Sequence, residues 1–345
     1  MIRFDCDYTE SAHPRILERL LSLQGEQNAG YGADPHCQTA ANYIKTAANA
    51  PMADVHFLVG GTQANAAIIS AALRPYQGVL SAATGHIACH EAGAIEAGGH
   101  KVLTLPGAQG KLTATQIQAA YDAHWDDKAH EHIVQPGMVY ISHPTESGTV
   151  YSLAELTAIS QTCRKLALPL MLDGARLGYG LAALGADVTL PDIARLCDVF
   201  CIGGTKMGAL FGEAVVIVNS ALQRDFRYLM KRQGGLLAKG FLLGIQFECL
   251  FEDRLYFELG KHGVMQALKI RQALLDAGVP LQYDTRTNQQ FPLVPDALCE
   301  RLGRDFTFAQ WEKPSEAQSV IRLCTSWATN DADVDALLAI LTKGE

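Results

Sequence analysis

The sequence lacks several features that mark whole classes of protein. No run approaches the ~18 apolar residues of a membrane-spanning helix, and the N-terminus, MIRFDCDYTE, carries acids where a secretory signal peptide has its apolar region. The nine cysteines include no CxxC pair, and most of them lie inside apolar runs. Such cysteines are typical of reduced core residues. We therefore expect a cytoplasmic protein without membrane contact.

The chain is also short of positive charge. Its 345 residues include 28 lysines and arginines against 36 aspartates and glutamates, which gives a formal net charge of −8. A nucleic-acid-binding protein needs a basic face to displace counterions from phosphates, and this sequence has no basic tract. We therefore expect no nucleic-acid partner.

Apolar runs of strand length dominate the middle of the chain. They predict strands at residues 54–59, 78–82, 101–105, 138–142, 170–172, 198–202 and 214–218. Helical segments separate most of these runs, and this alternation predicts an α/β fold with a mostly parallel sheet and right-handed crossovers.

After Val218 the pattern changes to longer helical segments. The expected helices cover residues 221–232, 240–259 and 264–277, and shorter elements follow them. We expect an N-terminal arm and a large α/β domain over residues 1–245, with a smaller C-terminal α+β domain over residues 246–345.

The stretch from Leu170 to Gly212 carries the clearest chemical signal. Its first strand ends at Asp173, and Lys206 follows in a glycine-rich loop between two expected core strands. Alone, each residue is typical of an ordinary turn or loop. Together they match pyridoxal phosphate chemistry. A lysine amine in a desolvated pocket bonds the cofactor aldehyde, and a carboxylate keeps the pyridine nitrogen protonated so that the ring accepts electrons.

A glycine turn provides a candidate phosphate site. Gly60 and Gly61 follow the strand at 54–59, and Thr62 and Gln63 open an Ala- and Ile-rich helix. The amides of a helix N-terminus and a hydroxyl group can bind a phosphate there. The segment matches neither GxGxxG nor GxxxxGK[ST], so a nicotinamide dehydrogenase and a nucleoside-triphosphate site are both disfavoured.

Several other residues are candidates for binding. His86 follows a strand, where an imidazole either forms ordinary hydrogen bonds or stacks on a planar cofactor. Arg322 interrupts an apolar strand, and a buried arginine is rare without an anion, which is either a ligand carboxylate or a structural acid. His130 and His132 lie in an acidic link without a cysteine pair or HExxH motif, so no metal site is expected.

In order and spacing, these segments resemble the threonine aldolase family of pyridoxal-phosphate enzymes, which has fold type I and is grouped with the β-eliminating lyases. The resemblance covers essentially the whole chain. The matching motifs are Phe4-Asp5-Cys6-Asp7, Tyr31-Gly32-Ala33-Asp34-Pro35, Gly61-Thr62-Gln63-Ala64-Asn65, His86 with Glu91-Ala92-Gly93, Asp173-Gly174-Ala175-Arg176, Thr205-Lys206 and Ile321-Arg322-Leu323.

The resemblance implies a set of functional residues and no metal. The implied catalytic residues are Lys206, His86 and Asp173. The implied cofactor ligands are Gly61, Thr62, Gln63, His86, Asp173, Arg176, Thr205, Lys206 and, from a neighbouring subunit, Arg232 or Lys231. The implied substrate ligands are Cys6, Asp7, Tyr31, His132, Arg176 and Arg322.

The resemblance further implies retro-aldol cleavage of L-threonine, L-allo-threonine or a related β-hydroxy-α-amino acid to glycine and an aldehyde. It implies a homo-oligomer, a dimer or tetramer, with the site at the subunit interface. β-Elimination or aminotransfer in the same fold is the alternative, and a non-catalytic relative would be expected to lack Lys206. The family commonly has serine or asparagine before Asp7, whereas Cys6 is a poorer donor. That difference leaves the substrate open. An imidazole, a water or the cofactor phosphate could each serve as the base.

Overall fold

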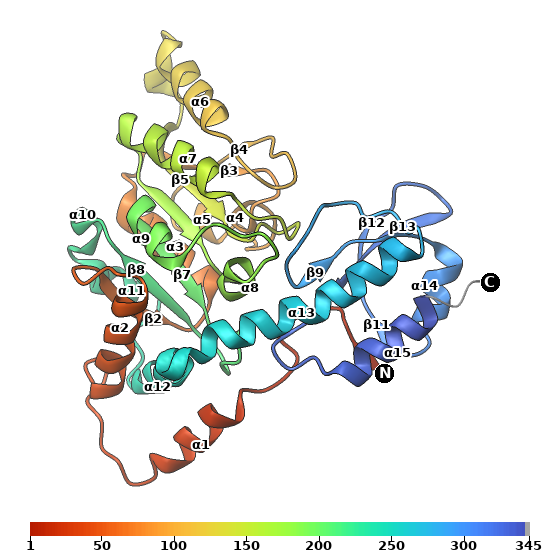
Figure 1. Ribbon diagram of the computed structural model, residues 1–345. Helices are drawn as coiled ribbons and strands as arrows, with labels where there is room; N and C mark the ends of the chain where they lie inside the picture. Colours follow the sequence, from red (N-terminus) through yellow and green to blue (C-terminus); the bar gives the residue numbers. More distant parts are fainter. Residues whose placement is uncertain (342–345) are drawn as a thin grey trace.

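A seven-stranded sheet forms the centre of the larger part of the molecule (Figure 1). The computed structural model describes residues 1–341, and its sheet has the order β2-β8-β7-β6-β5-β3-β4. The strands are β2 (Asp54–Leu58), β3 (Gln77–Ala82), β4 (Val102–Leu105), β5 (Gln135–Ser142), β6 (Leu170–Asp173), β7 (Val199–Gly203) and β8 (Glu213–Ile217). Only β8 runs against its neighbours in this sheet. The predicted α/β fold with a mostly parallel sheet is confirmed.

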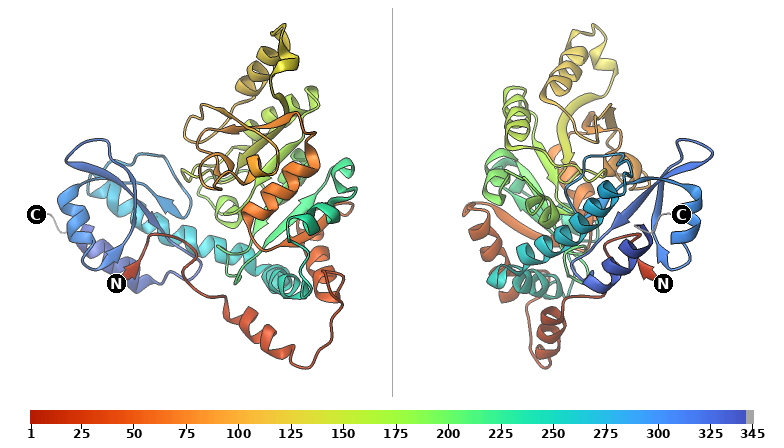
Figure 2. Two further views of the ribbon diagram at one scale, coloured as in Figure 1. Left: turned by 180° about the vertical axis from the view of Figure 1, so that it is seen from behind. Right: turned by 45° about the vertical axis from the view of Figure 1, so that its right-hand side comes forward.

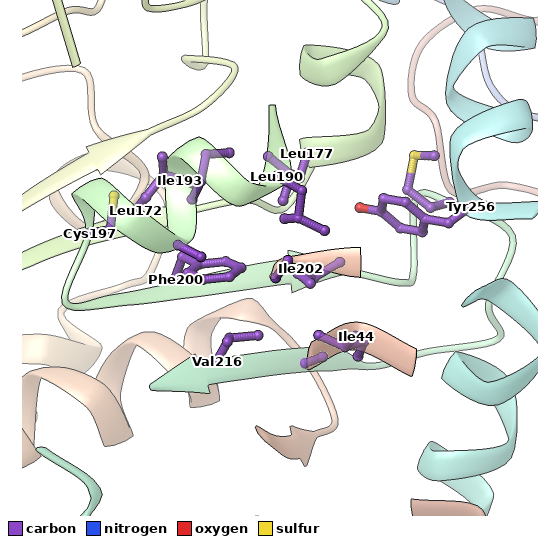
Figure 3. Close-up of a cluster of buried hydrophobic side chains, with 14 of the residues drawn as sticks. Ile44, Leu172, Leu177, Leu190, Ile193, Cys197, Phe200, Ile202, Val216 and Tyr256 are labelled. Atoms are coloured by element: carbon purple, nitrogen blue, oxygen red, sulfur yellow. The ribbon is translucent and has the colours of Figure 1, made fainter. Parts of the chain in front are cut away.

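The central strands are continuous runs of buried residues because helices cover both faces of the sheet. Helices α8 (Leu177–Leu181) and α9 (Leu190–Leu196) cover one face, and α3 (Gly61–Ala72) covers the other. Figure 3 shows the first of these layers. Its labelled side chains include Leu172, Leu177, Leu190, Ile193, Phe200, Ile202, Val216 and Tyr256.

The remaining helices of this part surround the sheet. They are α1 (Pro14–Ser22), α2 (Pro35–Ala47), α4 (His86–Cys89), α5 (Ala94–Ala97), α6 (Ala114–Asp126), α7 (Leu153–Lys165), α10 (Ser220–Gln223), α11 (Phe226–Arg232) and α12 (Phe241–Phe251). Ser152 and Glu155 have the spacing of a capping box, which predicts a helix over residues 152–166, and α7 begins with that capping box. Among residues 1–341, none of the helices combines the length and the apolar character that crossing a membrane requires.

The C-terminal part has its own sheet and core, and α13 (Leu255–Asp276) joins it to the larger part (Figures 1 and 2). Its elements are β9 (Gln289–Gln290), β10 (Leu293–Pro295), α14 (Asp296–Leu302), β11 (Phe306–Thr307), β12 (Ala309–Glu312), β13 (Gln318–Cys324) and α15 (Asp331–Leu341). The N-terminal strand β1 (Ile2–Arg3) pairs with β11, so the N-terminal segment belongs to this part, as do the last described residues, in α15. The domain boundary expected after residue 245 stays a prediction; the core of the C-terminal part consists of Phe4 and of residues from Ile270 onward.

Three expected helices have different bounds in the structure. Asp225 adopts a left-handed φ of 61° and divides the helix expected at 221–232 into α10 and α11. Asp253 and Arg254, with φ of 51° and 61°, end the one expected at 240–259. The gap expected before residue 264 is absent, because α13 continues through Gly260. At Gly260 the helix packs closely against Gly178. A Cβ atom there would lie 2.4 Å from the carbonyl oxygen of Gly178.

Candidate active site

A cavity of about 680 Å³ lies at the carboxyl edge of the sheet, where parallel α/β sheets bind ligands. The loops that follow β2, β3, β5, β6 and β7 form most of its wall, and Trp311 and Arg322 close it from the C-terminal part. The structure brings together here the predicted residues Gly61, Thr62, His86, Asp173, Arg176, Thr205, Lys206 and Arg322.

Asp173 is fixed on the floor of this cavity by hydrogen bonds to both of its oxygens. Its Oδ2 accepts from the Tyr140 hydroxyl at 2.7 Å and from Asn65 Nδ2 at 3.0 Å. Its Oδ1 accepts from the backbone N–H of Ala175 at 2.9 Å. The side chain is 5% exposed. The arrangement holds a carboxylate in one position at the end of β6, as the sequence predicts.

His86 is oriented by a buried acid. Its Nδ1 lies 2.7 Å from Glu91 Oε1, which also accepts from Asn65 Nδ2 at 2.7 Å. The hydrogen bond to Glu91 raises the pKa of His86, although burial acts in the opposite direction. Asn65 therefore donates both to Glu91, which orients His86, and to Asp173.

The N-terminus of α3 faces the cavity without a side-chain cap. Gly60 and Gly61 leave this approach open, since a Cβ atom on Gly60 would meet nothing within 4 Å. Thr62 and Thr205 line the same end of the cavity, and the Thr205 hydroxyl oxygen accepts from the N–H of Gly212 at 3.1 Å. First-turn amides and nearby hydroxyl groups suit a phosphate group.

Glu213 lies beside this end of the cavity. It is 2% exposed, and its Oε2 is buried without a hydrogen-bond partner among the described residues. Burial raises the pKa of Glu213 to about 8. The sequence analysis did not single this residue out, because a glutamate at the start of a strand is usually solvated.

Two arginines lie near the opening on the side of Lys206. Arg176 donates to Asp7 through Nε at 2.7 Å and Nη2 at 3.0 Å. Burial opposes the charge on Asp7, but the cations of Arg176 and Lys206 lower the pKa of Asp7 overall. Arg322 donates to the carbonyl oxygen of Asp5 at 2.7 Å, while its Nε is buried without a partner. An unpaired guanidinium donor at the cavity suits an anionic ligand.

The other predicted site residues do not line the cavity within one chain. Gln63 instead accepts from Val59 N and donates to the carbonyl oxygen of Gln233, so it braces the turn. Asp7 lies behind Arg176, and Cys6 lies beside Asp5.

Tyr31, Arg232 and His132 are exposed. Tyr31 lines a second cavity of about 370 Å³, with Lys231 Nζ 4.9 Å from its ring centroid. His132 lies in the short helix η1 (His130–His132) that follows α6. Within residues 1–341, no group of three or more His, Cys, Asp or Glu residues could hold a metal ion.

Glu146 is a further cavity residue that the sequence analysis missed. It lies on the loop after β5 and lines the cavity beside His86 and Asp173. Burial raises the pKa of Glu146 above its ordinary value. Tyr8 and Trp311 also line the cavity, and Lys206 Nζ lies 5.7 Å from the ring centroid of Tyr8. Their side chains gave no local sequence signal, because only the tertiary fold brings them to this position.

The geometry fits pyridoxal phosphate. Lys206 and Asp173 face one cavity, an uncapped helix N-terminus opens at one end, and Arg322 has an unpaired donor. The cavity is within the usual size range for small-molecule sites. These are the positions that a cofactor aldehyde, pyridine nitrogen and phosphate, and a substrate carboxylate, require.

Comparison with known proteins gives matches along most of the chain. The beta-eliminating lyase family model matches residues 11–294. A low specificity L-threonine aldolase from Pseudomonas sp. is 32% identical over 316 residues, or 90% of this chain and 88% of that protein. The solved threonine aldolase of Leishmania major is 44% identical, with a TM-score of 0.96 over 99% of this chain and 98% of that one. An aspartate aminotransferase from Thermus thermophilus shares the fold at 12% identity and a TM-score of 0.72, over 99% of this chain and 90% of that one.

Proposed function

Because the chain belongs to the threonine aldolases of the beta-eliminating lyase family, we propose that it cleaves L-threonine, L-allo-threonine or a related β-hydroxy-α-amino acid. The products are glycine and an aldehyde, and the cofactor is pyridoxal 5'-phosphate. The observation that carries the proposal is the cavity itself, which Lys206, Asp173 and Arg322 line together.

The residues of the chain have separate roles in this reaction. When bound, pyridoxal phosphate supplies an electron sink that accepts the electron pair released by cleavage of the Cα–Cβ bond. Lys206 provides the amine that bonds the cofactor aldehyde, and Asp173 holds a proton on the pyridine nitrogen. His86, held by Glu91, would contact the cofactor ring, and the amides at the N-terminus of α3 would hold its phosphate.

Arg322 determines how the amino acid lies in the cavity. Its guanidinium group, whose Nε has no partner among the described residues, binds the substrate carboxylate. Trp311 supports the guanidinium from one face, at 5.4 Å from the ring centroid to the Arg322 carbon. Arg176 lines the same cavity but has two of its nitrogens committed to Asp7, so it shapes the site and contributes mainly its charge.

An absorbance experiment tests the reaction. The purified protein with pyridoxal phosphate is expected to show a visible band, to change that band on addition of glycine, and to release acetaldehyde from L-threonine or L-allo-threonine. Lys206→Ala is expected to lose turnover by roughly 10⁴-fold or more because no other amine in the cavity can replace it. A visible band that shifts without any aldehyde release would contradict the aldolase activity and point to elimination or aminotransfer. Full activity in Lys206→Ala would remove the assigned role of that lysine.

The proposal includes a homo-oligomer, a dimer or tetramer, in which Tyr31 and Arg232 or Lys231 complete the site of a neighbouring subunit. The support is that these residues are exposed and outside their own cavity, while the second cavity beside Tyr31 leaves an opening between α2 and α11. Mixed Lys206→Ala and Arg232→Ala subunits test it. If Arg232 acts across the interface, mixing two weak variants restores part of the activity in hybrids. Activity that stays additive after unfolding and refolding the mixture together would contradict the shared site.

We also propose a cytoplasmic location for this enzyme. All of its cysteines are free, and six of them are buried. Free cysteines persist in a reducing compartment. Fractionation of cells with a tagged chain checks this, and recovery outside the cytoplasm would contradict it.

A further inference from the structure

Glu146 is held in place by the loop that follows β5. The Thr145 and Thr149 hydroxyl groups lie 2.7 Å apart, and the N–H of Thr145 donates to the carbonyl oxygen of Thr149 at 2.8 Å. Glu146 lines the main cavity and also a side chamber of about 30 Å³ that it shares with His86, Asp173 and Lys206. A chamber of that size holds about one water molecule.

The two oxygens of Glu146 have different surroundings. Oε1 accepts from the Ser142 hydroxyl at 2.6 Å and from the backbone N–H of His86 at 2.9 Å, so both of its lone pairs are used. Oε2 is buried and has no partner among the described residues. Leaving such an atom unpaired is unfavourable unless a ligand or water pairs with it. Oε2 is therefore the oxygen that is available for a proton.

Other groups around the cavity are less suited to accept a proton from a substrate. Both oxygens of Asp173 already accept hydrogen bonds. His86 has its Nδ1 committed to Glu91 at 2.7 Å, and this hydrogen bond raises the pKa of His86. Glu213 is beside Gly61, at the end of the cavity assigned to the phosphate. His90 also lines the cavity, but its side chain is exposed.

We propose that Glu146 is the general base that takes the proton from the substrate β-hydroxyl, either directly or through one water in the side chamber. The inference rests on the proposed function. The O–H electron pair forms the carbonyl of the departing aldehyde, and the Cα–Cβ pair stays with the glycine fragment. Glu146 Oε2 holds the hydroxyl proton, and the glycine fragment later gains one proton at Cα. The overall reaction therefore neither consumes nor releases protons.

The surroundings of Glu146 adjust its proton affinity toward this role. Burial raises the pKa of Glu146, the charge of Asp173 raises it further, and the Ser142 hydroxyl lowers it. The other titratable or charged groups near it are Tyr140, Tyr151, His86, Cys89, Arg176 and Lys206. A carboxyl with a pKa moved toward neutrality is a better general base than an ordinary glutamate.

The test compares Glu146→Gln with the wild type and with Glu155→Gln as a matched control. Glu155 lies outside the cavity and pairs with Lys111. In Glu146→Gln, aldehyde release is expected to fall roughly 10²- to 10⁴-fold. The visible cofactor band, the cofactor dissociation constant and the exchange of the glycine α-proton in D₂O are expected to stay within about threefold, because none of them involves a hydroxyl proton. Glu155→Gln is expected to match the wild type in every assay.

Two pH measurements separate a base from a merely structural residue. Carbon-13 NMR of the labelled glutamates, as a difference between wild type and Glu146→Gln, is expected to place the Glu146 titration above that of an ordinary glutamate. The acid limb of kcat/KM is expected to follow that titration in the wild type, to disappear in Glu146→Gln and to move to higher pH in Ser142→Ala. The last shift follows from loss of a donor that favours the ionised form.

Three results would overturn the proposal. Undiminished aldehyde release by Glu146→Gln would be compatible with the aldolase activity but would show that Glu146 is not the general base. Equal loss of cleavage and of glycine exchange would show a general disturbance of the site. A wild type that releases no aldehyde from any β-hydroxy amino acid would overturn the function together with the base, and this is recognised before any substitution is made.

Discussion

The carboxylate on the floor of the cavity differs from the charged groups on its wall. On the floor, both oxygens of Asp173 are paired, and the unpaired buried atoms lie behind it, at Asn65 Oδ1 and Glu91 Oε2. On the wall, Glu146 and Glu213 each keep one buried oxygen without a partner among the described residues, and Arg322 keeps one buried nitrogen. Each unpaired atom costs free energy in the empty chain.

This difference distinguishes a side chain that is fixed in position before the ligand binds from side chains that gain a hydrogen-bond partner when the ligand binds. A fully paired carboxylate does not need to move or change its proton when the cofactor binds, which suits the partner of a pyridine nitrogen. An unpaired buried donor or acceptor gains a partner only when a ligand or water arrives. The substitutions below remove one group from the floor and two from the wall.

Among these three substitutions, the largest effect is expected on the floor, from Asp173→Asn. The amide keeps the shape and can still accept from Tyr140 and Asn65, but it removes the charge that holds the pyridine proton. We expect kcat to fall by roughly 10²-fold or more, with a smaller change in KM. Steady-state kinetics at saturating cofactor measure this. A rate within a few-fold of the wild type would show that the paired floor only supports the fold.

A smaller effect is expected on the wall, from Arg322→Lys. Lysine keeps the charge but cannot present the guanidinium fork, so the substrate carboxylate loses part of its binding. We expect kcat/KM to fall roughly 10- to 100-fold, mainly through KM. Cofactor affinity is expected to be unchanged. Arg195→Lys, an exposed residue paired with Asp192, is the control. Weakened cofactor binding in Arg322→Lys alone would place Arg322 on the cofactor instead of the substrate.

The floor could be predicted from the sequence far better than the wall. An acid at the end of an apolar run and a lysine in a glycine loop are local patterns, and Asp173 and Lys206 lie where those patterns place them. Glu146 and Glu213 look like ordinary charged residues in the sequence, because glutamates are mostly solvated. Their burial depends on the packing of separate elements. Gln63 shows the converse: its place in the glycine turn suggested a ligand, but its side chain braces Val59 and Gln233.

The same limit applies to the helices. The sequence predicts helices at residues 36–48, 113–124 and 152–166, which lie within a few residues of the bounds of α2, α6 and α7. It could not show that α13 continues through Gly260, because glycine ordinarily marks a break. The close approach of α13 to α8, where Gly260 meets Gly178, is a tertiary contact that no local pattern contains.

The smallest effect on activity and the clearest effect on pH dependence are expected from Glu213→Gln. Burial raises the pKa of Glu213 from 4.5 to about 8, so the folded chain keeps a proton that the unfolded chain releases. The stability that Glu213 contributes is therefore fully present below about pH 4.5 and is lost as pH rises toward 8. Glutamine does not titrate, so the variant lacks this loss.

Urea unfolding of the cofactor-free protein at pH 6 and pH 9, at one protein concentration, measures the difference. We expect the free energy of unfolding of the wild type to fall, relative to that of Glu213→Gln, by a few kcal/mol from pH 6 to pH 9. Each pKa unit corresponds to about 1.4 kcal/mol. Glu155→Gln is the control: despite partial burial, the hydrogen bond from Lys111 lowers the pKa of Glu155, so it is ionised in both states over this range. If Glu213→Gln and the wild type change in parallel, Glu213 is ionised in the folded protein. Its unpaired oxygen would then have a cation or water as its partner, and the wall would resemble the floor.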